Sequence, residues 1–259
     1  MTNKCNICGS KQTFKLIRWD YNIDLIKCKQ CKTVAANDLP SDQFLDDYYD
    51  GFSSDKSIIP GYSDKMISLF KKRIGLLFPK PIKNSSFLDY GGGIGAGTKA
   101  ASDLGFDSYL YDIDEKALET ARTGMGIDER KIIRDLDRKF NCILADNVIE
   151  HRKDPGEMVR FLYEKLSPRG TLVLRTPNVA SIEEAFFPNT IIYFFTALRF
   201  NKMHVVLKHI FLNPWWCCAP PRHLYGLGPK SFKALAKKLS LTSFKVVFHS
   251  EPFGACIQQ

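Results

Sequence analysis

The pattern of apolar and polar residues predicts helices that alternate with short strands along most of the chain. An amphipathic helix opens at Ser63 and stops before Pro79, with apolar side chains recurring at helical spacing. A second helix begins at Asp154, because an Asp cap, a Pro in the first turn and a Glu three residues after the cap form a typical helix start. Short apolar runs predict strands at 87–90, 108–112, 141–146 and 171–175.

This alternation, with short connections, indicates an α/β fold in which helices cover both faces of a mostly parallel sheet. Ligands of such sheets bind at the carboxyl ends of the strands. We expect three parts along the chain: a cysteine-rich segment at 1–40, a linker and N-terminal helix at 41–85, and the main domain at 86–259.

Composition excludes several classes of protein. With 44% apolar and 25% charged residues, the chain can bury a core and is not expected to be disordered. No apolar stretch approaches the roughly 20 residues of a membrane span, and the first residues lack the apolar run of a secretory signal. We therefore expect a cytoplasmic protein whose eight cysteines are metal ligands or buried thiols rather than disulfides.

The net charge of +9 is unevenly distributed. Residues 89–180 are nearly neutral at −2, whereas residues 61–88 carry +5 and residues 181–259 carry +6. A basic surface beside a neutral core indicates an anionic partner, such as a phosphorylated small molecule, a nucleotide-sugar, nucleic acid or an anionic membrane. The alternative is a lysine-rich surface that only keeps the chain in solution.

Four cysteines near the N-terminus form two C-x2-C pairs separated by 19 residues. The pairs are Cys5 with Cys8 and Cys28 with Cys31, and their spacing is typical of a four-cysteine zinc site. Four thiolates complete a tetrahedron, so such a zinc ion is structural rather than catalytic. It would supply much of the folding free energy of this small ribbon, on the order of 10 kcal/mol. The alternative is a thiol cluster that holds no metal.

A glycine-rich turn follows the strand at 87–90 and opens a helix, as expected of a loop that approaches a nucleotide cofactor. Gly91, Gly93 and Ala96 match the dinucleotide pattern, and Asp112 lies at the end of the next strand, where it can hold the ribose hydroxyls. The loop alone therefore fits both NAD and S-adenosylmethionine. Asp89 favours the second, because a carboxylate at the strand end attracts a sulfonium and repels a pyrophosphate.

Four motifs together resemble class I S-adenosylmethionine-dependent methyltransferases, in particular bacterial small-molecule and sugar methyltransferases with an N-terminal four-cysteine zinc ribbon. They are Asp89-x-Gly91-x-Gly93-x-Gly95, Tyr111-Asp112-Ile113-Asp114, Asn147-Val148-Ile149-Glu150-His151, and the segment 166–178. The resemblance covers nearly the whole chain. It implies a Rossmann-like sheet and S-adenosylmethionine as the cofactor, with an NAD enzyme as the alternative.

The same resemblance implies the residues of the cofactor site. They are Asp89, Gly91, Gly93, Gly95, Asp112, Asp135, Leu136 and Asn147. The glycines would cradle the methionine part, Asp112 the ribose, and Asp135 with Leu136 the adenine. Asp137 competes with Asp135 by spacing, and Asn147 can also line the substrate pocket.

Methyl transfer to a hydroxyl usually needs a general base, because hydroxyls are poor nucleophiles at neutral pH. The resemblance makes His151 and His223 the candidates, each with the alternative of a packing or orienting role. Tyr225 and Arg222 are expected to contact the substrate, and a guanidinium can hold phosphate bidentately. The aromatic and basic insertion at 179–221 is expected to form a lid, or alternatively to touch an anionic membrane through 186–216.

We therefore expect a methyltransferase that acts on an anionic small molecule or glycan, either phosphorylated or glycosidic. The alternatives are an RNA or protein methyltransferase that uses the ribbon for recognition, and a non-catalytic cofactor-binding subunit. Nucleic acid is disfavoured because the Asn/Asp-Pro-Pro-Tyr signature is absent at 146–149. Only 251–259 remains for the last strand of the sheet, so that strand is very short or missing. The sequence does not indicate the oligomeric state.

Overall fold

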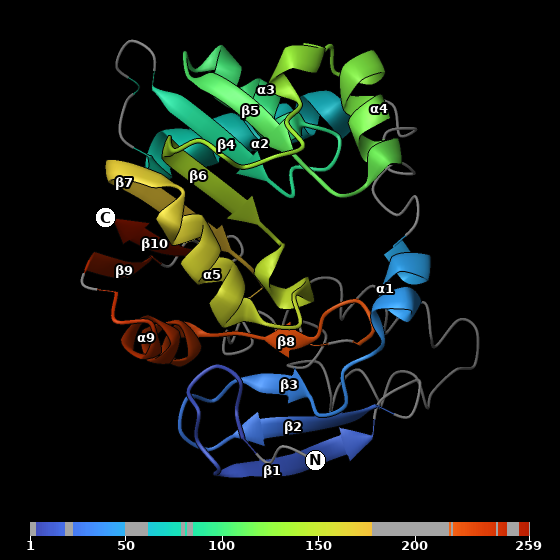
Figure 1. Ribbon diagram of the computed structural model, residues 1–259, viewed down its shortest axis with the longest axis vertical. Helices are drawn as coiled ribbons and strands as arrows, with labels where there is room; N and C mark the ends of the chain where they lie inside the picture. The colour runs from blue at the N-terminus through green and yellow to red at the C-terminus, as the bar shows by residue number, and fades with distance from the viewer. Residues whose placement is uncertain are drawn as a thin grey trace, which may run out of the picture.

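The computed structural model describes residues 4–18, 23–49, 62–78, 85–177, 220–241, 243–247 and 254–258, together with Pro81 and Cys218. Among these residues two sheets form, a six-stranded sheet flanked by helices and a smaller four-stranded sheet at the other end of the molecule (Figure 1).

The main sheet has the strand order β5-β4-β6-β7-β10-β9. Its strands are β4 (Ser86–Tyr90), β5 (Asp107–Tyr111), β6 (Phe140–Asp146), β7 (Leu166–Arg175), β9 (Ser243–Val247) and β10 (Gly254–Gln258). The four strands β5, β4, β6 and β7 run parallel to one another. Strand β10 pairs antiparallel with both β7 and β9. The last strand is therefore present but only five residues long.

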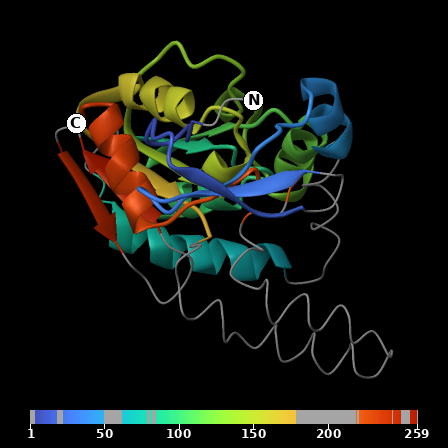
Figure 2. The ribbon, with the colours of Figure 1, turned by 90° about the horizontal axis from the view of Figure 1, so that it is seen from below.

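Helices cover both faces of this sheet, as the alternation of elements predicts. They are α2 (Tyr62–Leu77), α3 (Ala96–Asp103), α4 (Glu115–Gly124), α5 (Pro155–Glu164) and α9 (Pro229–Lys238). Viewed from below, α2 lies on one side of the sheet and α5 on the other (Figure 2). Asp154 caps α5 as predicted, because its carboxylate accepts a hydrogen bond from the Glu157 amide at 2.9 Å.

Consecutive strand residues point into different cores, which explains why the central strands are apolar throughout. Phe87 packs with Ile74 of α2 and Ala100 of α3, while its neighbour Leu88 belongs to the core that contains Leu162 of α5. Every residue of β4 is buried, Asp89 included. A polar side chain in this strand is therefore enclosed by protein.

The smaller sheet joins the cysteine-rich N-terminal segment to a strand that lies much later in the chain. Its strands are β1 (Thr13–Arg18), β2 (Asp24–Cys28), β3 (Val34–Ala36) and β8 (Tyr225–Gly226), all paired antiparallel. The cysteine-rich segment supplies three strands, and the fourth comes from residues that lie just before α9. The expected linker after residue 40 contains a further helix, α1 (Asp42–Tyr49).

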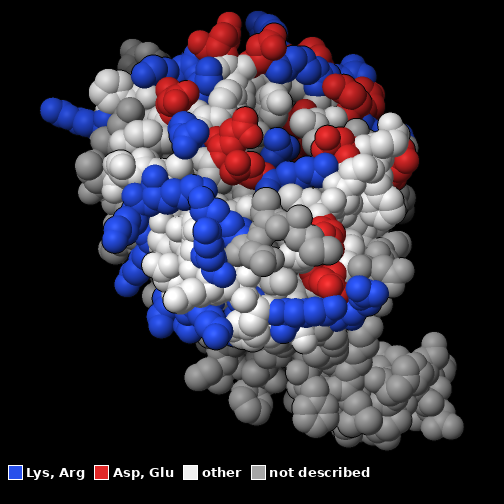
Figure 3. Space-filling model, turned by 60° about the horizontal axis from the view of Figure 1, so that its bottom comes forward, with Lys and Arg blue, Asp and Glu red and all other residues white. Residues whose placement is uncertain are grey.

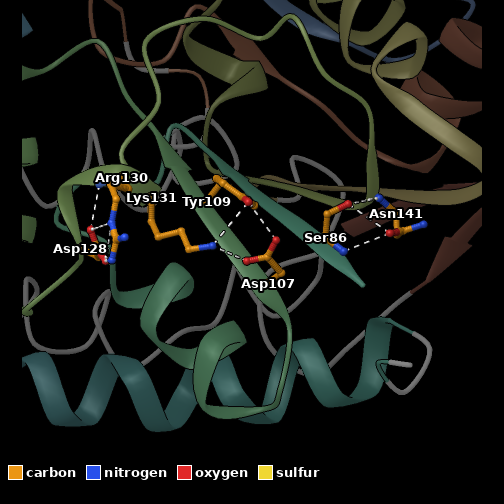
Figure 4. Close-up of polar contacts among 7 residues, drawn as sticks. All are labelled: Ser86, Asp107, Tyr109, Asp128, Arg130, Lys131 and Asn141. Atoms are coloured by element: carbon orange, nitrogen blue, oxygen red, sulfur yellow. Dashed lines mark hydrogen bonds and ion pairs between the residues drawn. The ribbon is translucent and has the colours of Figure 1, made fainter. Parts of the chain in front are cut away.

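Polar contacts hold the amino ends of the parallel strands in register (Figure 4). The Ser86 amide donates to Asn141 Oδ1 at 3.0 Å, and the Asn141 amide donates to Ser86 Oγ at 3.1 Å, so the starts of β4 and β6 are tied together. Beside them, Asp107 pairs with Lys131 and accepts a hydrogen bond from the Tyr109 hydroxyl. These contacts leave the opposite, carboxyl edge of the sheet for ligand binding.

Candidate active site

The glycine-rich loop lies at the carboxyl end of β4, where the fold predicts a ligand. Gly91 has φ 70°, and its amide donates to the Tyr111 carbonyl at 2.7 Å, which turns the chain sharply out of the strand. A Cβ atom at Gly91 would lie 2.6 Å from a methyl group of Val148. The loop is thus packed closely against the segment after β6 (Phe140–Asp146), which also carries His151.

Asp112 fits the role of ribose holder that the sequence assigns to it. Its two carboxylate oxygens accept hydrogen bonds from the Gly93 amide at 2.7 Å and from the Asp114 amide at 2.9 Å. Each oxygen keeps a further lone pair, so the carboxylate can accept from two ribose hydroxyls while it holds the loop. Burial raises the pKa of Asp112, with the backbone amides opposing the shift.

Asp89 lies beneath the glycine loop rather than on its open side. Its carboxylate is almost wholly buried and accepts a hydrogen bond from the Thr98 hydroxyl at 3.0 Å. Cβ atoms at Gly92 and Gly97 would approach the same carboxylate to 2.5 and 2.6 Å, so the loop closes over it. Burial raises the pKa of Asp89 to about 7. Asp89 therefore supports the loop from below, and its direct contact with a cofactor stays a prediction.

The remaining predicted cofactor residues border the same edge of the sheet. Asn147 follows β6, is exposed, and has φ 56°, a left-handed conformation that Asn tolerates. Leu136 is buried in the core, while Asp135 beside it is exposed. Asp137 is exposed too, so the alternative between Asp135 and Asp137 stays open.

The two predicted catalytic histidines come together although they lie far apart in the sequence. His151 ends the short 3-10 helix η4 (Ile149–His151), and its ring centroid is 4.8 Å from that of His223. His151 Nδ1 lies 2.6 Å from the carbonyl oxygen of Arg222. Because a carbonyl only accepts, Nδ1 carries the proton of this contact, so the Arg222 carbonyl fixes the orientation and the tautomer of the neutral ring.

Glu150 joins this pair, and sequence reasoning missed it. One ligand atom each from Glu150, His151 and His223 lies within 4.8 Å of the others. Glu150 is completely buried, and burial raises its pKa to about 8, with the Thr176 hydroxyl acting in the opposite direction. Neither carboxylate oxygen makes a hydrogen bond of ordinary geometry among the described residues. The one sequence signal for Glu150 is its position directly before His151.

Tyr225 departs from its expected role as a substrate contact. The side chain is 1% exposed, and its hydroxyl accepts from Asn6 Nδ2 at 2.8 Å and donates to the Lys153 carbonyl at 3.0 Å. With the hydroxyl used on both sides, Tyr225 links the cysteine-rich segment to the chain just after His151. Arg222 is half-buried, and its carbonyl orients His151.

A buried ion pair that the sequence analysis also missed lies at the end of β6 and β7 (Leu166–Arg175). Arg175 pairs with Asp146, and Arg73 of α2 reaches the same carboxylate oxygen at 3.7 Å. Two arginines from different elements are thus held near the carboxyl edge of the sheet. Lys71, which lies on the same helix, pairs with Asp103 at 2.8 Å.

The four N-terminal cysteines form the cluster that their spacing predicts. Cys5 Sγ lies 3.6 Å from Cys31 Sγ, Cys8 Sγ lies 3.6 Å from Cys28 Sγ, and all four sulfurs are within 4.8 Å of one another. Sulfurs about 2.3 Å from a tetrahedral zinc ion are roughly 3.8 Å apart, so the donor set is compatible with zinc. A hydrogen bond from Cys5 lowers the pKa of Cys31 to about 5, which favours a thiolate.

Most of the insertion at 179–221, with the membrane-contact region 186–216 and the basic residues Arg199 and Lys202, lies outside the described residues. Cys218 is buried at its end. Among the helices that the structure describes, none has the length and apolar character needed to cross a membrane.

Comparison with known proteins agrees with this geometry. A family model described as "Methyltransferase domain" matches residues 62–243. The ubiquinone biosynthesis O-methyltransferase of Caulobacter sp. (strain K31) is 31% identical over 108 residues, 38% of this chain and 43% of that protein. The match therefore spans less than half the length of this curated relative.

Two solved structures share the fold at low sequence identity. A SAM-dependent methyltransferase from Archaeoglobus fulgidus is 15% identical with a TM-score of 0.50, covering 74% of this chain and 94% of that chain. Human N-acetylserotonin methyltransferase, solved in complex with SAM, is 13% identical with a TM-score of 0.55, covering 85% of this chain and 60% of that chain.

Proposed function

The chain belongs to the methyltransferase-domain family, and from that membership we propose that it transfers the methyl group of S-adenosylmethionine to an oxygen atom of a small polar acceptor. The observation that carries the proposal is that the glycine loop and Asp112 lie at the same edge of the sheet as the cluster of Glu150, His151 and His223, of which Glu150 and His223 are buried. When bound, S-adenosylmethionine supplies an electrophilic methyl group on a sulfonium.

The residues present fit this cofactor. The glycines let the loop pack tightly against Val148 and Asp89, where a Cβ atom would collide, and Asp112 has lone pairs left for two hydroxyls. Asp89 lies under the loop, and a negative charge there would favour the cationic sulfonium. These contacts bind and align the donor, and alignment with exclusion of water supplies much of the rate in such displacements.

The acceptor is activated at the cluster of Glu150, His151 and His223. The carbonyl of Arg222 fixes the tautomer of His151, so Nε2 is the ring nitrogen with which His151 would accept the proton of an acceptor hydroxyl. The curated relatives named as O-methyltransferases support oxygen as the methylated atom. Their partial coverage leaves the identity of the acceptor to experiment.

We propose further that the acceptor is anionic, either a phosphorylated or a glycosidic molecule. Arg222 lies beside His223 in sequence and Arg73 reaches the carboxyl edge of the sheet, so both can meet such a group. Figure 3 shows Lys and Arg side chains gathered over the end of the molecule that carries the small sheet and α9, while charges of both signs mix over the main domain. The basic end favours the approach of anions.

Calorimetry with S-adenosylhomocysteine and a methyl-transfer assay on matched pairs of phosphorylated and neutral acceptors test the proposal. We expect S-adenosylhomocysteine to bind and NAD not to bind. Arg222→Ala should raise the KM of a phosphorylated acceptor at least tenfold and leave cofactor affinity unchanged, because uniform binding is lost. Arg160→Ala, at an exposed position on α5, is the matched control. NAD binding without S-adenosylhomocysteine binding would overturn the cofactor assignment, and equal use of both acceptors would overturn the anionic one.

A further inference from the structure

The buried ion pair at the carboxyl edge of the main sheet leaves one oxygen atom of Asp146 without a hydrogen bond. Arg175 pairs with Oδ2 of Asp146, and Arg73 of α2 reaches the same oxygen at 3.7 Å. The other oxygen, Oδ1, is buried and makes no hydrogen bond among the described residues. The side chain is only 7% exposed. Because a buried charged oxygen without a donor is costly, native proteins usually provide one, from a protein group, a water or a ligand.

The register of the sheet places Asp146 beside the glycine loop. Strands β4 and β6 are parallel, and Asp89 lies opposite Leu144. Side chains alternate between the two faces of a sheet, so Asp146, two residues after Leu144, is on the same face as Asp89 and nearer the carboxyl edge. At that level the chain after β4 has already turned into the loop at Gly91. On the other side, β7 places Arg175 directly opposite Asp146. Asp146 therefore lies between the glycine loop and β7.

The spacing of the strands fits the shape of the proposed donor. Asp112, which fits the role of ribose holder, follows β5, and Asp146 ends β6. The strand order β5-β4-β6 separates these two strand ends by two steps of about 4.8 Å, or roughly 10 Å in all. A ribose bound at Asp112, with the sulfur directed toward the histidines that follow β6, brings the amino-acid part of the donor into this interval. That part carries an ammonium group, which is a strong donor of hydrogen bonds.

The charges around Asp146 suit a zwitterion better than a single ion. Two guanidinium groups reach its carboxylate, and its negative charge adds to the burial that raises the pKa of Asp89. Arg73 and Arg175 therefore balance Asp89 and Asp146 when all four groups are ionised. A lone cation would be opposed by the arginines, and a lone anion by the aspartates. An α-amino acid carries an ammonium and a carboxylate on one carbon atom, so each of its charges can face the opposite charge of this group.

We propose that Asp146 binds the α-ammonium group of the methionine part of S-adenosylmethionine through Oδ1, with the α-carboxylate on the side of Arg73. The inference rests on the proposed function, because it adds a contact to the donor that the proposed function names. Arg175 is a positioning residue, since its ion pair with Oδ2 fixes the orientation of the Asp146 carboxylate. The ammonium then makes a charge-assisted hydrogen bond with the oxygen that otherwise has none. Asp146 touches no reacting atom, so it determines the affinity and alignment of the donor.

Calorimetry with three ligands tests this assignment without any need for methyl transfer. S-adenosylhomocysteine carries the ammonium and the carboxylate, decarboxylated S-adenosylhomocysteine keeps only the ammonium, and 5′-methylthioadenosine lacks both. Asp146→Asn should weaken binding of the first two at least tenfold, the loss expected for a hydrogen bond between charged groups, and leave binding of the third unchanged. Asp107→Asn breaks an ion pair with Lys131 at the amino edge of the same sheet, and as the matched control it should bind all three ligands normally. Equal weakening of all three ligands by Asp146→Asn, or of none, would overturn the proposal.

A second variant separates binding from folding, because Asp146→Asn leaves the buried Arg175 beside a neutral side chain. The double variant Asp146→Asn/Arg175→Gln removes both charges, and thermal unfolding verifies that each chain is folded. We expect the double variant to bind S-adenosylhomocysteine at least tenfold more weakly than the unmodified chain. Recovery of normal affinity would mean that Asp146 only neutralises Arg175, and the proposal would fail.

The unmodified chain tests the proposed function separately. If it does not bind S-adenosylhomocysteine, the donor itself is wrong, and the role of Asp146 falls with it. If it binds S-adenosylhomocysteine and Asp146→Asn binds equally well, only the role of Asp146 is refuted and methyl transfer stands.

Discussion

The hydroxyl of Tyr225 should determine how firmly the cysteine-rich segment is attached to the active site. It accepts from Asn6 Nδ2 at 2.8 Å and donates to the Lys153 carbonyl at 3.0 Å, inside a side chain that is 1% exposed. Tyr225→Phe removes both bonds without changing the packing of the ring. With each bond contributing about 0.5–1.5 kcal/mol, the free energy of unfolding should fall by about 1–3 kcal/mol.

The same change should affect catalysis selectively. Lys153 lies two residues after His151, and Tyr225 lies two residues after His223, so loosening this link frees the segments that hold both histidines. We expect a lower kcat for the acceptor with unchanged S-adenosylhomocysteine affinity, since the Tyr225 hydroxyl bonds to Asn6 and Lys153 rather than to the glycine loop or Asp112.

Urea unfolding at a fixed zinc concentration measures the first effect, and zinc release to a chromogenic chelator reports the ribbon directly. Tyr163→Phe is the matched control, because the structure gives its half-buried hydroxyl no hydrogen bond among the described residues. If Tyr225→Phe loses no more stability than Tyr163→Phe and releases zinc at the same rate, the ribbon is not held through this hydroxyl.

Three other changes test the cofactor loop and the ribbon. Asp112→Ala should weaken S-adenosylhomocysteine binding by about 1.5–3 kcal/mol in calorimetry, because charge-assisted bonds to the ribose are lost; an unchanged Kd would assign the ribose to another residue. Burial raises the pKa of Asp89 to about 7 from 3.8, so the folded chain holds this proton more tightly than the unfolded chain does, and the associated stability is lost as the pH rises from about 4 to about 7. In the absence of cofactor, the free energy of unfolding of Asp89→Asn minus that of the unmodified chain should therefore be larger at about pH 8 than at about pH 4. A difference that does not change with pH would contradict the shift. Cys28→Ser should remove the ribbon zinc and destabilise the small sheet before it lowers activity, as metal analysis and unfolding would detect; loss of activity with the sheet intact would contradict a structural role.

Local sequence signals predicted the parallel strands and several helices of the main domain. The Asp cap and proline at 154–155 predicted the start of α5, and the short apolar runs predicted β4 to β7 within one residue at most ends, apart from the earlier start of β7. These features depend on neighbours along the chain, such as a cap and its amide or a glycine that must turn. The two C-x2-C pairs are also local features, because a tight turn brings the two cysteines of each pair together.

Tertiary structure decided what surrounds each polar group, since burial depends on segments that are distant in sequence. It placed Asp89 beneath the loop, used the Tyr225 hydroxyl as a link, and brought the predicted pair His151 and His223 together with an unexpected third member, Glu150. It also completed the cysteine-rich sheet with β8, so that a segment 190 or so residues further along the chain belongs to the same sheet as β3. Periodicity indicates which face of an element is apolar, but the partner that covers a carboxylate or accepts from a hydroxyl is determined only when the sheets pack.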